Sequence, residues 1–382
     1  MYVGSPERGY RFSTDGLSDM RKTIIKGAPF MTFEEIMNYA RKQQCSDIHI
    51  TVGTALAVRR YGVLTILDPT PTAEESKQMI YSILSEDQIN YVNSGKDLDV
   101  GVMLPDGLRI RANVYHQRNN LAASIRILQQ TIPTFEKLGL PSAIRQMAET
   151  PRGLVLVTGP TGSGKSTTLA SVVNYINMNS ARHIMTIEDP IEYVYPHNKA
   201  MIHQREVGRD VESFSLALRS ALREDPDVIL VGEMRDYETI SAAITAAETG
   251  HLVLSTLHTT SAAQTVERII DASPLEAQEQ IRAQFANVIR GVFTQQLLPL
   301  KDGSGRVLAS EVMLATPAIT NLIRESKTIQ IPSMLQQSRA QGMSTMNDAL
   351  ADLVRRDVVS IIEAKKVSPD AQSLVKAIHG NF

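Results

Sequence analysis

The 382-residue sequence contains a single cysteine, Cys45. One cysteine excludes an intramolecular disulfide framework and any zinc site built from several cysteines, which fits a reducing cytoplasm. No run of about eighteen apolar residues occurs, so the sequence predicts no transmembrane helix. The amino terminus also lacks the apolar core of a signal peptide. We therefore expect a cytoplasmic protein.

The sequence has little excess charge of either sign. Its formal net charge is −2, and it contains no long basic run. Nucleic-acid binding depends on lysines and arginines that neutralise phosphates. We therefore expect no nucleic acid among the partners, although a near-neutral total does not exclude a local basic patch.

The first third of the chain predicts a small α/β domain behind a mobile extension. Residues 1–30 are polar and irregular, and we expect them to be mobile. From Phe33 the segment "FEEIMNYARKQQ" has apolar residues at helical spacing, and Thr32 is suited to cap that helix. Short alternating runs follow, and "LPDGLR" between two of them is a hairpin signal. Residues 31–130 thus predict a domain with a largely antiparallel sheet.

The rest of the chain predicts a second α/β domain. The stretch "QQTIPTFEKLGLPSAIRQMAETPRG" contains three prolines and two glycines, and we interpret residues 131–150 within it as a linker. Beyond them come the near-continuous apolar runs "GLVLVTG", "HIMTIED", "DVILVGE" and "HLVLSTL", separated by segments of helical length. Such runs are typical of strands buried on both faces, so residues 151–382 predict a mainly parallel sheet between helices, with a helical C-terminal part that contains one hairpin.

The strongest motif is "GPTGSGKST", which follows the first apolar strand and opens a helix. In this setting it predicts a phosphate loop, whose backbone N–H groups turn inward on a phosphate. Lys165 is expected to reach the β and γ oxygens, and the hydroxyl of Ser166 is expected to ligate Mg²⁺. The predicted nucleotide contacts are Gly159, Pro160, Thr161, Gly162, Ser163, Gly164, Lys165, Ser166 and Thr167.

Acidic residues follow the next two predicted strands. Glu188, Asp189 and Glu192 lie in "TIEDPIEYVY", where Pro190 ends the strand at the sheet edge that binds ligands in open α/β folds. Glu233 follows "VILVG", in which a glycine occupies the place where many nucleotide hydrolases carry an aspartate. The other carboxylates at this edge, with Ser166 and water, can still complete a magnesium site.

Two histidines flank the last apolar strand. His251 begins it and His258 leaves its far end, so an extended chain separates them by about 23 Å and they cannot share one metal ion. Because His258 leaves on the carboxyl side of the sheet, we place it with the phosphate-binding residues. From chemistry alone, His251 is as consistent with a capped strand end as with a functional role.

Four segments together, "GPTGSGKST", "TIEDPIEYVY", "ALREDPDVILVGEMRD" and "AAETGHLVLSTLHTTSA", resemble the Walker A, Asp, Walker B and His boxes of the type II/IV secretion ATPases. "SDIHI", "HQREVGRD" and the late "ATPAITNLIRE" extend this resemblance over nearly the whole chain after residue 31. The resemblance implies a PAS-like N-terminal domain joined by a flexible linker to a RecA-like ATPase domain. It is nearest to the branch of the family that retracts type IV pili.

The resemblance also assigns roles to individual residues. It implies that Glu192 and Glu233 are catalytic carboxylates, with Glu233 acting on Mg²⁺ through water, and that His251 and His258 both belong to the catalytic set. It further points to Arg111 and Arg126 of the N-terminal domain as charges that complete the site across a domain or subunit boundary. From the residues alone, an arginine on the polar face of a strand is more simply solvated.

The same resemblance implies a hexameric ATPase that uses ATP and Mg²⁺ to power pilus retraction. Its expected partners are further copies of the chain, an inner-membrane platform protein and other pilus ATPases, and its expected place is the inner face of the cell membrane at the pilus base. Relatives that extend pili or secrete proteins carry a four-cysteine zinc module, which this chain lacks, and this favours retraction. Thr320 replaces an arginine of the late motif and leaves an accessory retraction role open.

Two alternatives from other functional classes stay open. A DNA-driving RecA-like motor would need a basic channel, which the charge balance disfavours. A nucleotide-dependent assembly factor would bind ATP through the same loop but hydrolyse little of it, because the loop by itself predicts binding and not cleavage.

Overall fold

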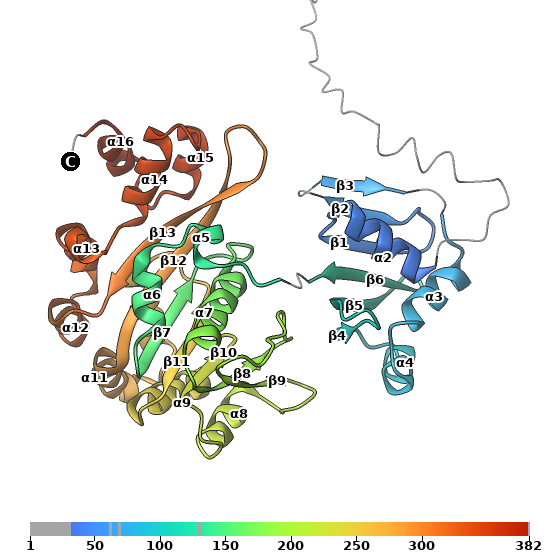
Figure 1. Ribbon diagram of the computed structural model, residues 1–382, viewed down its shortest axis with the longest axis horizontal. Helices are drawn as coiled ribbons and strands as arrows, with labels where there is room; N and C mark the ends of the chain where they lie inside the picture. Colours follow the sequence, from blue (N-terminus) through green and yellow to red (C-terminus); the bar gives the residue numbers. More distant parts are fainter. Residues whose placement is uncertain (1–31, 61–62, 68–69, 129–130, 381–382) are drawn as a thin grey trace, which may run out of the picture. The chain divides into compact units, whose positions relative to one another are not determined.

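The computed structural model describes residues 32–60, 63–67, 70–128 and 131–380 (Figure 1). The expected N-terminal extension, residues 1–30, lies outside these residues. The described chain divides into two compact units. The first runs to Val102 and includes Ala112–Ile127, and the second includes Met103–Arg111 and the chain from Leu128 onward.

The N-terminal part of the chain builds a six-stranded sheet in the order β3-β2-β1-β6-β5-β4. Strand β1 pairs antiparallel with β2 and β6, and β2 pairs antiparallel with β3, as expected. The strands are β1 (Asp47–Ile50), β2 (Ala57–Arg60), β3 (Val63–Ile66), β4 (Leu98–Met103), β5 (Arg109–Gln117) and β6 (Asn120–Ile127), and the helices of this part are α2 (Phe33–Lys42), α3 (Ala73–Tyr81) and α4 (Glu86–Asn93).

Local signals in this part of the sequence are confirmed. Helix α2 starts at a capping box in which the backbone N–H of Thr32 donates to Glu35 Oε2 at 2.7 Å and the Thr32 hydroxyl accepts from the backbone N–H of Glu35. The predicted hairpin turn joins β4 to β5. There Leu104 N–H donates to Leu108 O at 2.8 Å, and Gly107 adopts a positive φ of 81° that favours glycine.

The second unit contains a seven-stranded sheet in the order β13-β12-β7-β11-β10-β8-β9. All its neighbouring strands are parallel except β12 and β13, which form the expected hairpin, so the mainly parallel sheet is confirmed. The strands are β7 (Gly153–Thr158), β8 (His183–Glu188), β9 (Met201–Glu206), β10 (Val228–Val231), β11 (Leu252–Leu257), β12 (Ile289–Pro299) and β13 (Arg306–Leu314). Sequence reasoning missed β9 as a strand, because this edge strand is largely polar.

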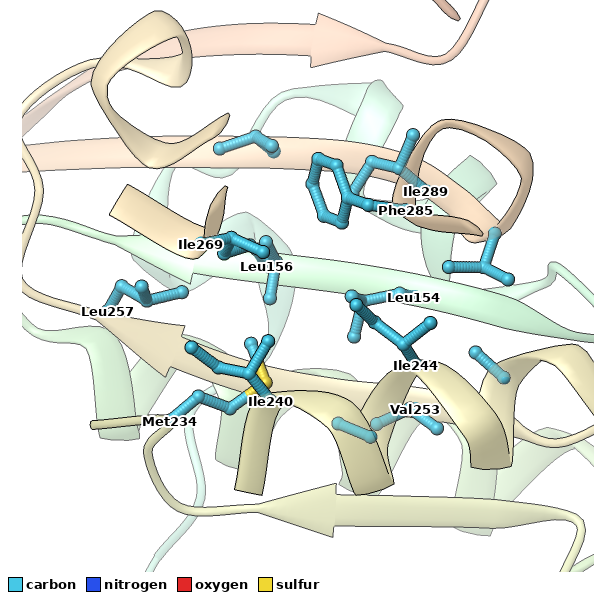
Figure 2. Close-up of a cluster of buried hydrophobic side chains, with 14 of the residues drawn as sticks. Leu154, Leu156, Met234, Ile240, Ile244, Val253, Leu257, Ile269, Phe285 and Ile289 are labelled. Atoms are coloured by element: carbon cyan, nitrogen blue, oxygen red, sulfur yellow. The ribbon is translucent and has the colours of Figure 1, made fainter. Parts of the chain in front are cut away.

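Alternate residues of the central strand β7 face two different cores. Leu154 and Leu156 pack in one core, part of which Figure 2 shows, and Val155 and Val157 pack in the other. Both sets of side chains are buried, which explains why the strand reads as a continuous apolar run.

Helices supply the residues that cover both faces of this sheet. The first core includes side chains from α8 (Phe214–Ala221), α9 (Tyr237–Glu248), α10 (Ala262–Asp271), α11 (Gln278–Val288), α12 (Pro317–Arg324) and α13 (Ile331–Gln337). The second includes side chains from α7 (Lys165–Asn179). A third, smaller core lies among α14 (Met346–Arg355), α15 (Ile361–Val367) and α16 (Ala371–His379), so the expected helical C-terminal part is present.

The segment expected to be a linker, residues 131–150, is instead part of the second unit. It forms α5 (Phe135–Leu138) and α6 (Ser142–Ala148), and the side chains of Phe135 and Ile144 are buried in the same core as α7. Gly139 ends α5 in the left-handed conformation, and Pro141 precedes α6. The proline and glycine that suggested a linker therefore mark the ends of two short helices.

Within the described residues, no helix is both long and apolar enough to cross a membrane.

The packing of α6 predicts that Ile144→Ala destabilises the second unit. Ile144 is fully buried, so we expect its truncation to lower the free energy of unfolding of that unit by about 2–5 kcal/mol. Urea unfolding followed by far-ultraviolet circular dichroism measures this change. Gln146→Ala alters an exposed residue of the same helix and is the matched control. Equal stability of the two variants would mean that the segment is a linker after all.

Candidate active site

The phosphate loop lies between the carboxyl end of β7 and the first turn of α7. Gly159, Gly162 and Gly164 have positive φ angles of 144°, 80° and 90°, which glycine adopts without strain. A Cβ atom on Gly159 would also overlap the backbone carbonyl oxygen of Gln295. The predicted loop is therefore confirmed as a glycine-dependent turn that opens a helix, which is the arrangement that binds phosphate.

Lys165 lies folded over this loop. Its Nζ atom donates to Gly159 O at 2.7 Å and to Pro160 O at 3.2 Å, and the side chain is buried. Burial lowers the pKa of Lys165, while the negative charges of Glu233 and Glu192 act to raise it. Lys165, Glu192 and Glu233 all follow the carboxyl ends of parallel strands, so they lie at one edge of the sheet.

Gln295 on β12 is hydrogen-bonded to the phosphate loop, and the sequence analysis did not identify this residue. Its Nε2 atom donates to Ser163 O at 2.5 Å, and its side chain is buried. On the same strand, the hydroxyl of Thr294 lies 2.8 Å from that of Thr158 at the end of β7. The detectable signal was a run of polar residues, "TQQ", inside an otherwise apolar strand.

The acidic segment after β8 holds a buried carboxyl group. Glu188 Oε1 accepts from Thr186 Oγ1 at 2.7 Å and from Gln204 Nε2 at 3.3 Å. Burial raises the pKa of Glu188 to about 7, well above the usual 4.5. Further along, the hydroxyl of Tyr193 lies 3.0 Å from Thr167 Oγ1, so the segment that carries Glu192 contacts the first turn of α7.

Glu233 and His258 face one another across two neighbouring strand ends. Glu233 follows β10 and His258 follows β11, and His258 Nε2 lies 3.5 Å from Glu233 Oε2. Glu233 also forms an ion pair with Arg235. The strands are parallel and in register, so both residues lie at the carboxyl edge, where the sequence placed them.

Gly232, the residue before Glu233, is hydrogen-bonded to both neighbouring strands. Its backbone N–H donates to Ile187 O at 2.8 Å, and its carbonyl accepts from Thr256 Oγ1 at 2.7 Å. A Cβ atom there would lie 3.4 Å from the Phe214 ring and 3.5 Å from the Cα atom of Glu188. Both distances are ordinary van der Waals contacts, so a Cβ atom would fit at this position.

The structure confirms that His251 lies just before β11, at the end of the strand opposite His258. His251 Nδ1 lies 2.9 Å from Ala246 O and 3.2 Å from Thr249 Oγ1, so the ring contacts the last turn of α9. Its carbonyl accepts from Gly153 N–H at 2.9 Å, at the start of β7. The phosphate loop follows the opposite end of β7. Because the two strands are parallel, His251 lies at the other edge of the sheet from the phosphate loop of its own chain.

The two candidate arginines lie in the six-stranded sheet. Arg126 on β6 pairs with Asp47 at 3.1 Å and keeps a side-chain exposure of 63%. Arg111 lies on β5 and is partly buried. Their role at the phosphate loop stays a prediction.

The residues at this edge fit a magnesium ion bound with a nucleotide. The described residues contain no group of three histidine, cysteine, aspartate or glutamate side chains that could hold a metal by themselves. Magnesium bound with a nucleotide needs few protein ligands, because phosphate oxygens and water fill most of its positions. Ser166, exposed in the first turn of α7, and the carboxylate of Glu233 supply the oxygen donors that this ion prefers.

Comparisons with known proteins agree with this geometry. The family model of the Type II/IV secretion system protein matches residues 27–366. The chain is 47% identical over 306 residues to the twitching motility protein of Neisseria gonorrhoeae, covering 80% of this chain and 82% of that protein. It is 44% identical over 339 residues to the type IV pilus retraction ATPase PilT of Pseudomonas aeruginosa, covering 88% and 98%. A crystal structure of the pilus retraction motor PilT with bound ADP superposes with a TM-score of 0.85 at 46% identity, over 91% of this chain and 100% of that one.

The positions of the two histidines predict different effects of their removal. We expect His258→Ala to lower kcat for ATP hydrolysis about 10- to 100-fold, because His258 contacts Glu233 at the phosphate edge. His251→Ala should leave kcat within about twofold but lower the free energy of unfolding by about 1 kcal/mol, since the ring contacts the end of α9. Steady-state phosphate release and urea unfolding measure the two effects. An equal loss of kcat in both variants would contradict this assignment.

The buried carboxyl group of Glu188 predicts a pH-dependent stability. Its pKa is about 7 in the folded chain against an ordinary 4.5, so unfolding releases a proton between these values. The free energy of unfolding should therefore fall as the pH rises from about 4.5 to 7. Glu188→Gln keeps an oxygen that accepts both hydrogen bonds but cannot ionise. Relative to wild type, we expect it to gain up to about 3 kcal/mol of stability between pH 4 and pH 8. A constant difference across this range of urea titrations would show that Glu188 has an ordinary pKa.

Proposed function

The chain belongs to the family of type II/IV secretion system proteins, and on that premise we propose that it is the motor ATPase that powers type IV pilus retraction. The observation that carries the proposal is the carboxyl edge of the seven-stranded sheet, where Lys165 on the phosphate loop follows β7, where Glu233 after β10 contacts His258 after β11, and where the charges of Glu233 and Glu192 act on Lys165. The pilus retraction motor PilT, which superposes closely on this chain, binds ADP.

The side chains at this edge can divide the work of hydrolysis. The phosphate loop and Lys165 bind and orient the triphosphate, with the amine exchanging the carbonyls of Gly159 and Pro160 for phosphate oxygens. Glu233 orients the attacking water, and Glu192 adds a second carboxylate near the same amine. Magnesium, held by Ser166 and through water by Glu233, would neutralise charge on the phosphates.

His258 is suited to report on the nucleotide. It is half exposed and rests against the carboxylate of Glu233, so a γ-phosphate beside Glu233 offers its ring a competing partner. The loop after β11 leads directly into α10, which starts at the cap residue Ser261. A change in the contacts of His258 therefore acts on the start of a helix that packs in the core of the unit.

Force generation needs contacts that change with the nucleotide. We propose that Arg126 and Arg111 of the N-terminal sheet reach a phosphate across a domain or subunit boundary and lose that contact when the γ-phosphate leaves. Arg126 is mostly exposed and pairs with a single carboxylate, that of Asp47, which a phosphate can replace.

The assembly that transmits this force is part of the proposal. We infer a ring of subunits, most simply a hexamer, at the inner face of the cell membrane at the pilus base. Its partners would be an inner-membrane platform protein and other pilus ATPases. The alternatives are an accessory retraction motor or a related secretion-type ATPase, and an assembly factor that hydrolyses little ATP.

Steady-state phosphate release tests the catalytic part of the proposal. We expect Glu233→Gln to lower kcat at least about 100-fold while nucleotide binding persists, because the carboxylate acts on water and not on the bound nucleotide. Lys165→Ala should lose nucleotide binding itself. Arg126→Ala should bind nucleotide as wild type does but hydrolyse it about tenfold or more slowly. Arg356→Gln changes an exposed arginine far along the chain and is the control.

Phosphate release and a complementation test in cells also separate the motor from the assembly factor. An assembly factor would release little phosphate, and Glu233→Gln would not lower the rate further. In a cell that lacks its retraction motor, the wild-type gene should restore pilus retraction, and the Lys165→Ala variant should not. Restoration by the Lys165→Ala variant would exclude the motor function.

A further inference from the structure

A pocket distinct from the nucleotide site lies in the same unit as the phosphate loop but is formed by other elements. Its volume is about 520 Å³, and side chains of α11 and α12 and the start of β12 line it. Two of the lining residues are arginines, Arg290 and Arg324, and none is acidic. The lining also includes the polar side chains of Asn287, Thr320 and Asn321.

Both arginines of the pocket lack an acidic partner among the described residues. Arg290 donates from Nε to Arg152 O at 3.1 Å and from Nη1 to two backbone carbonyls, those of Asn287 and Ile289, each at 3.0 Å. Arg324 donates from Nη2 to Asn287 Oδ1 at 2.8 Å. In both cases the partner is a neutral oxygen and the positive charge is not compensated.

The charge at this place carries an energetic cost. Burial and the neighbouring Arg152 lower the pKa of Arg290, because both disfavour its positive charge. An anion in the pocket would relieve this repulsion, and each guanidinium retains donor groups that no described side chain occupies. Two arginines that converge on one hollow are the arrangement that recognises a carboxylate or a phosphate by paired hydrogen bonds.

The uncharged lining favours a peptide over a phosphate group. Asn321 Nδ2 donates to Glu325 at 2.9 Å, which leaves its Oδ1 atom as an acceptor, and Thr320 Oγ1 already donates to Pro317 O at 3.2 Å. A phosphodiester or a fully deprotonated phosphate offers acceptors alone and cannot use these oxygens, and a protonated phosphate offers at most one or two donors. A peptide offers backbone N–H donors to them, and its carboxylates can bind the arginines. Two alanines and a proline supply the apolar surface on which such a segment can lie.

The pocket is separate from the nucleotide site. Arg290 contacts the backbone of Arg152, just before β7 begins, while the phosphate loop follows the other end of β7. The two sites therefore lie at opposite ends of the strands, and β7 and β12 run from one site to the other. Gln295, which supports the phosphate loop, is on the same strand as Arg290.

We propose that this pocket binds a carboxylate-bearing peptide segment of a partner protein, with Arg290 and Arg324 holding its acidic side chains or its C-terminal carboxylate. Asn321 and Thr320 accept hydrogen bonds from its backbone. The proposal concerns a partner contact, and it does not require that the chain hydrolyse ATP.

Fluorescence anisotropy with the full-length chain tests the proposal. The probe is a short fluorescein-labelled peptide in which glutamates alternate with glycine and serine, and the reference probe carries glutamine in place of glutamate. We expect the acidic probe to bind at least about tenfold more tightly than the reference. Arg324→Gln should weaken that binding about tenfold, because it removes an exposed charge without disturbing the backbone contacts that Arg290 makes.

A second variant blocks the pocket by different chemistry. Thr320→Glu places a carboxylate four residues before Arg324 on α12, where it can form an ion pair with the guanidinium and so compete with the probe. It should weaken binding of the probe about as much as Arg324→Gln does. Arg356→Gln removes an exposed arginine elsewhere and should leave binding unchanged. All three variants should keep the wild-type kcat and KM for ATP, which distinguishes a failure here from a failure of the ATPase assignment.

Three results would overturn the proposal. The first is equal binding of the acidic and glutamine probes, or no binding of either. The second is that the Arg324→Gln and Thr320→Glu variants both bind the acidic probe as tightly as the wild-type chain does. The third is displacement of the probe by inorganic phosphate or by vesicles of phosphatidylglycerol as readily as by unlabelled acidic peptide, which would assign the pocket to a phosphate group.

Discussion

The buried ammonium group of Lys165 is the charge on which the arrangement of the carboxyl edge depends. It has lost much of its water and is stabilised by two loop carbonyls and by the charges of Glu192 and Glu233. These two carboxylates come from different strand ends, so both can act on one amine only if β8 and β10 end at the same edge of the sheet. The parallel register of the sheet meets this requirement, and the two buried cores hold the register in place. A site that binds a highly charged ligand is thus built from residues whose positions are fixed by apolar packing.

Much of this arrangement could be predicted from the sequence, because the signals are local. A glycine-rich loop between an apolar strand and a helix is specific to phosphate binding, and acids after parallel strands must meet at one edge. The same logic placed His258 correctly. It also placed His251 at the start of the strand, far from His258, and the catalytic role that the family resemblance implies for His251 stays a prediction. The geometry of a six-residue strand puts the two histidines at opposite ends.

The remaining errors come from contacts that sequence spacing does not encode. Gln295 lies far along the chain from Ser163, and strand order alone brings β12 beside β7. The segment around Gly139 and Pro141 was interpreted as a linker because these residues disfavour the interior of helices, yet here they end one helix and begin another. The apolar residues Phe135 and Ile144 were the better signal in the sequence, because a mobile linker has no core in which to bury them.

Strand β12 connects the arginine-lined pocket with the phosphate loop. It carries Arg290 beside the pocket and, five positions on, Gln295 beneath the loop. It pairs with β7 on one side and β13 on the other, so it cannot shift alone without breaking the hydrogen bonds to both neighbours. A displacement of the phosphate loop that moves Gln295 must therefore be absorbed by its side chain or carried by the sheet as a whole. Side chains in close-packed interiors have little free space in which to absorb it. Arg290 and Gln295 therefore keep a fixed spacing, because the strand that carries both is held on each side by a neighbouring strand.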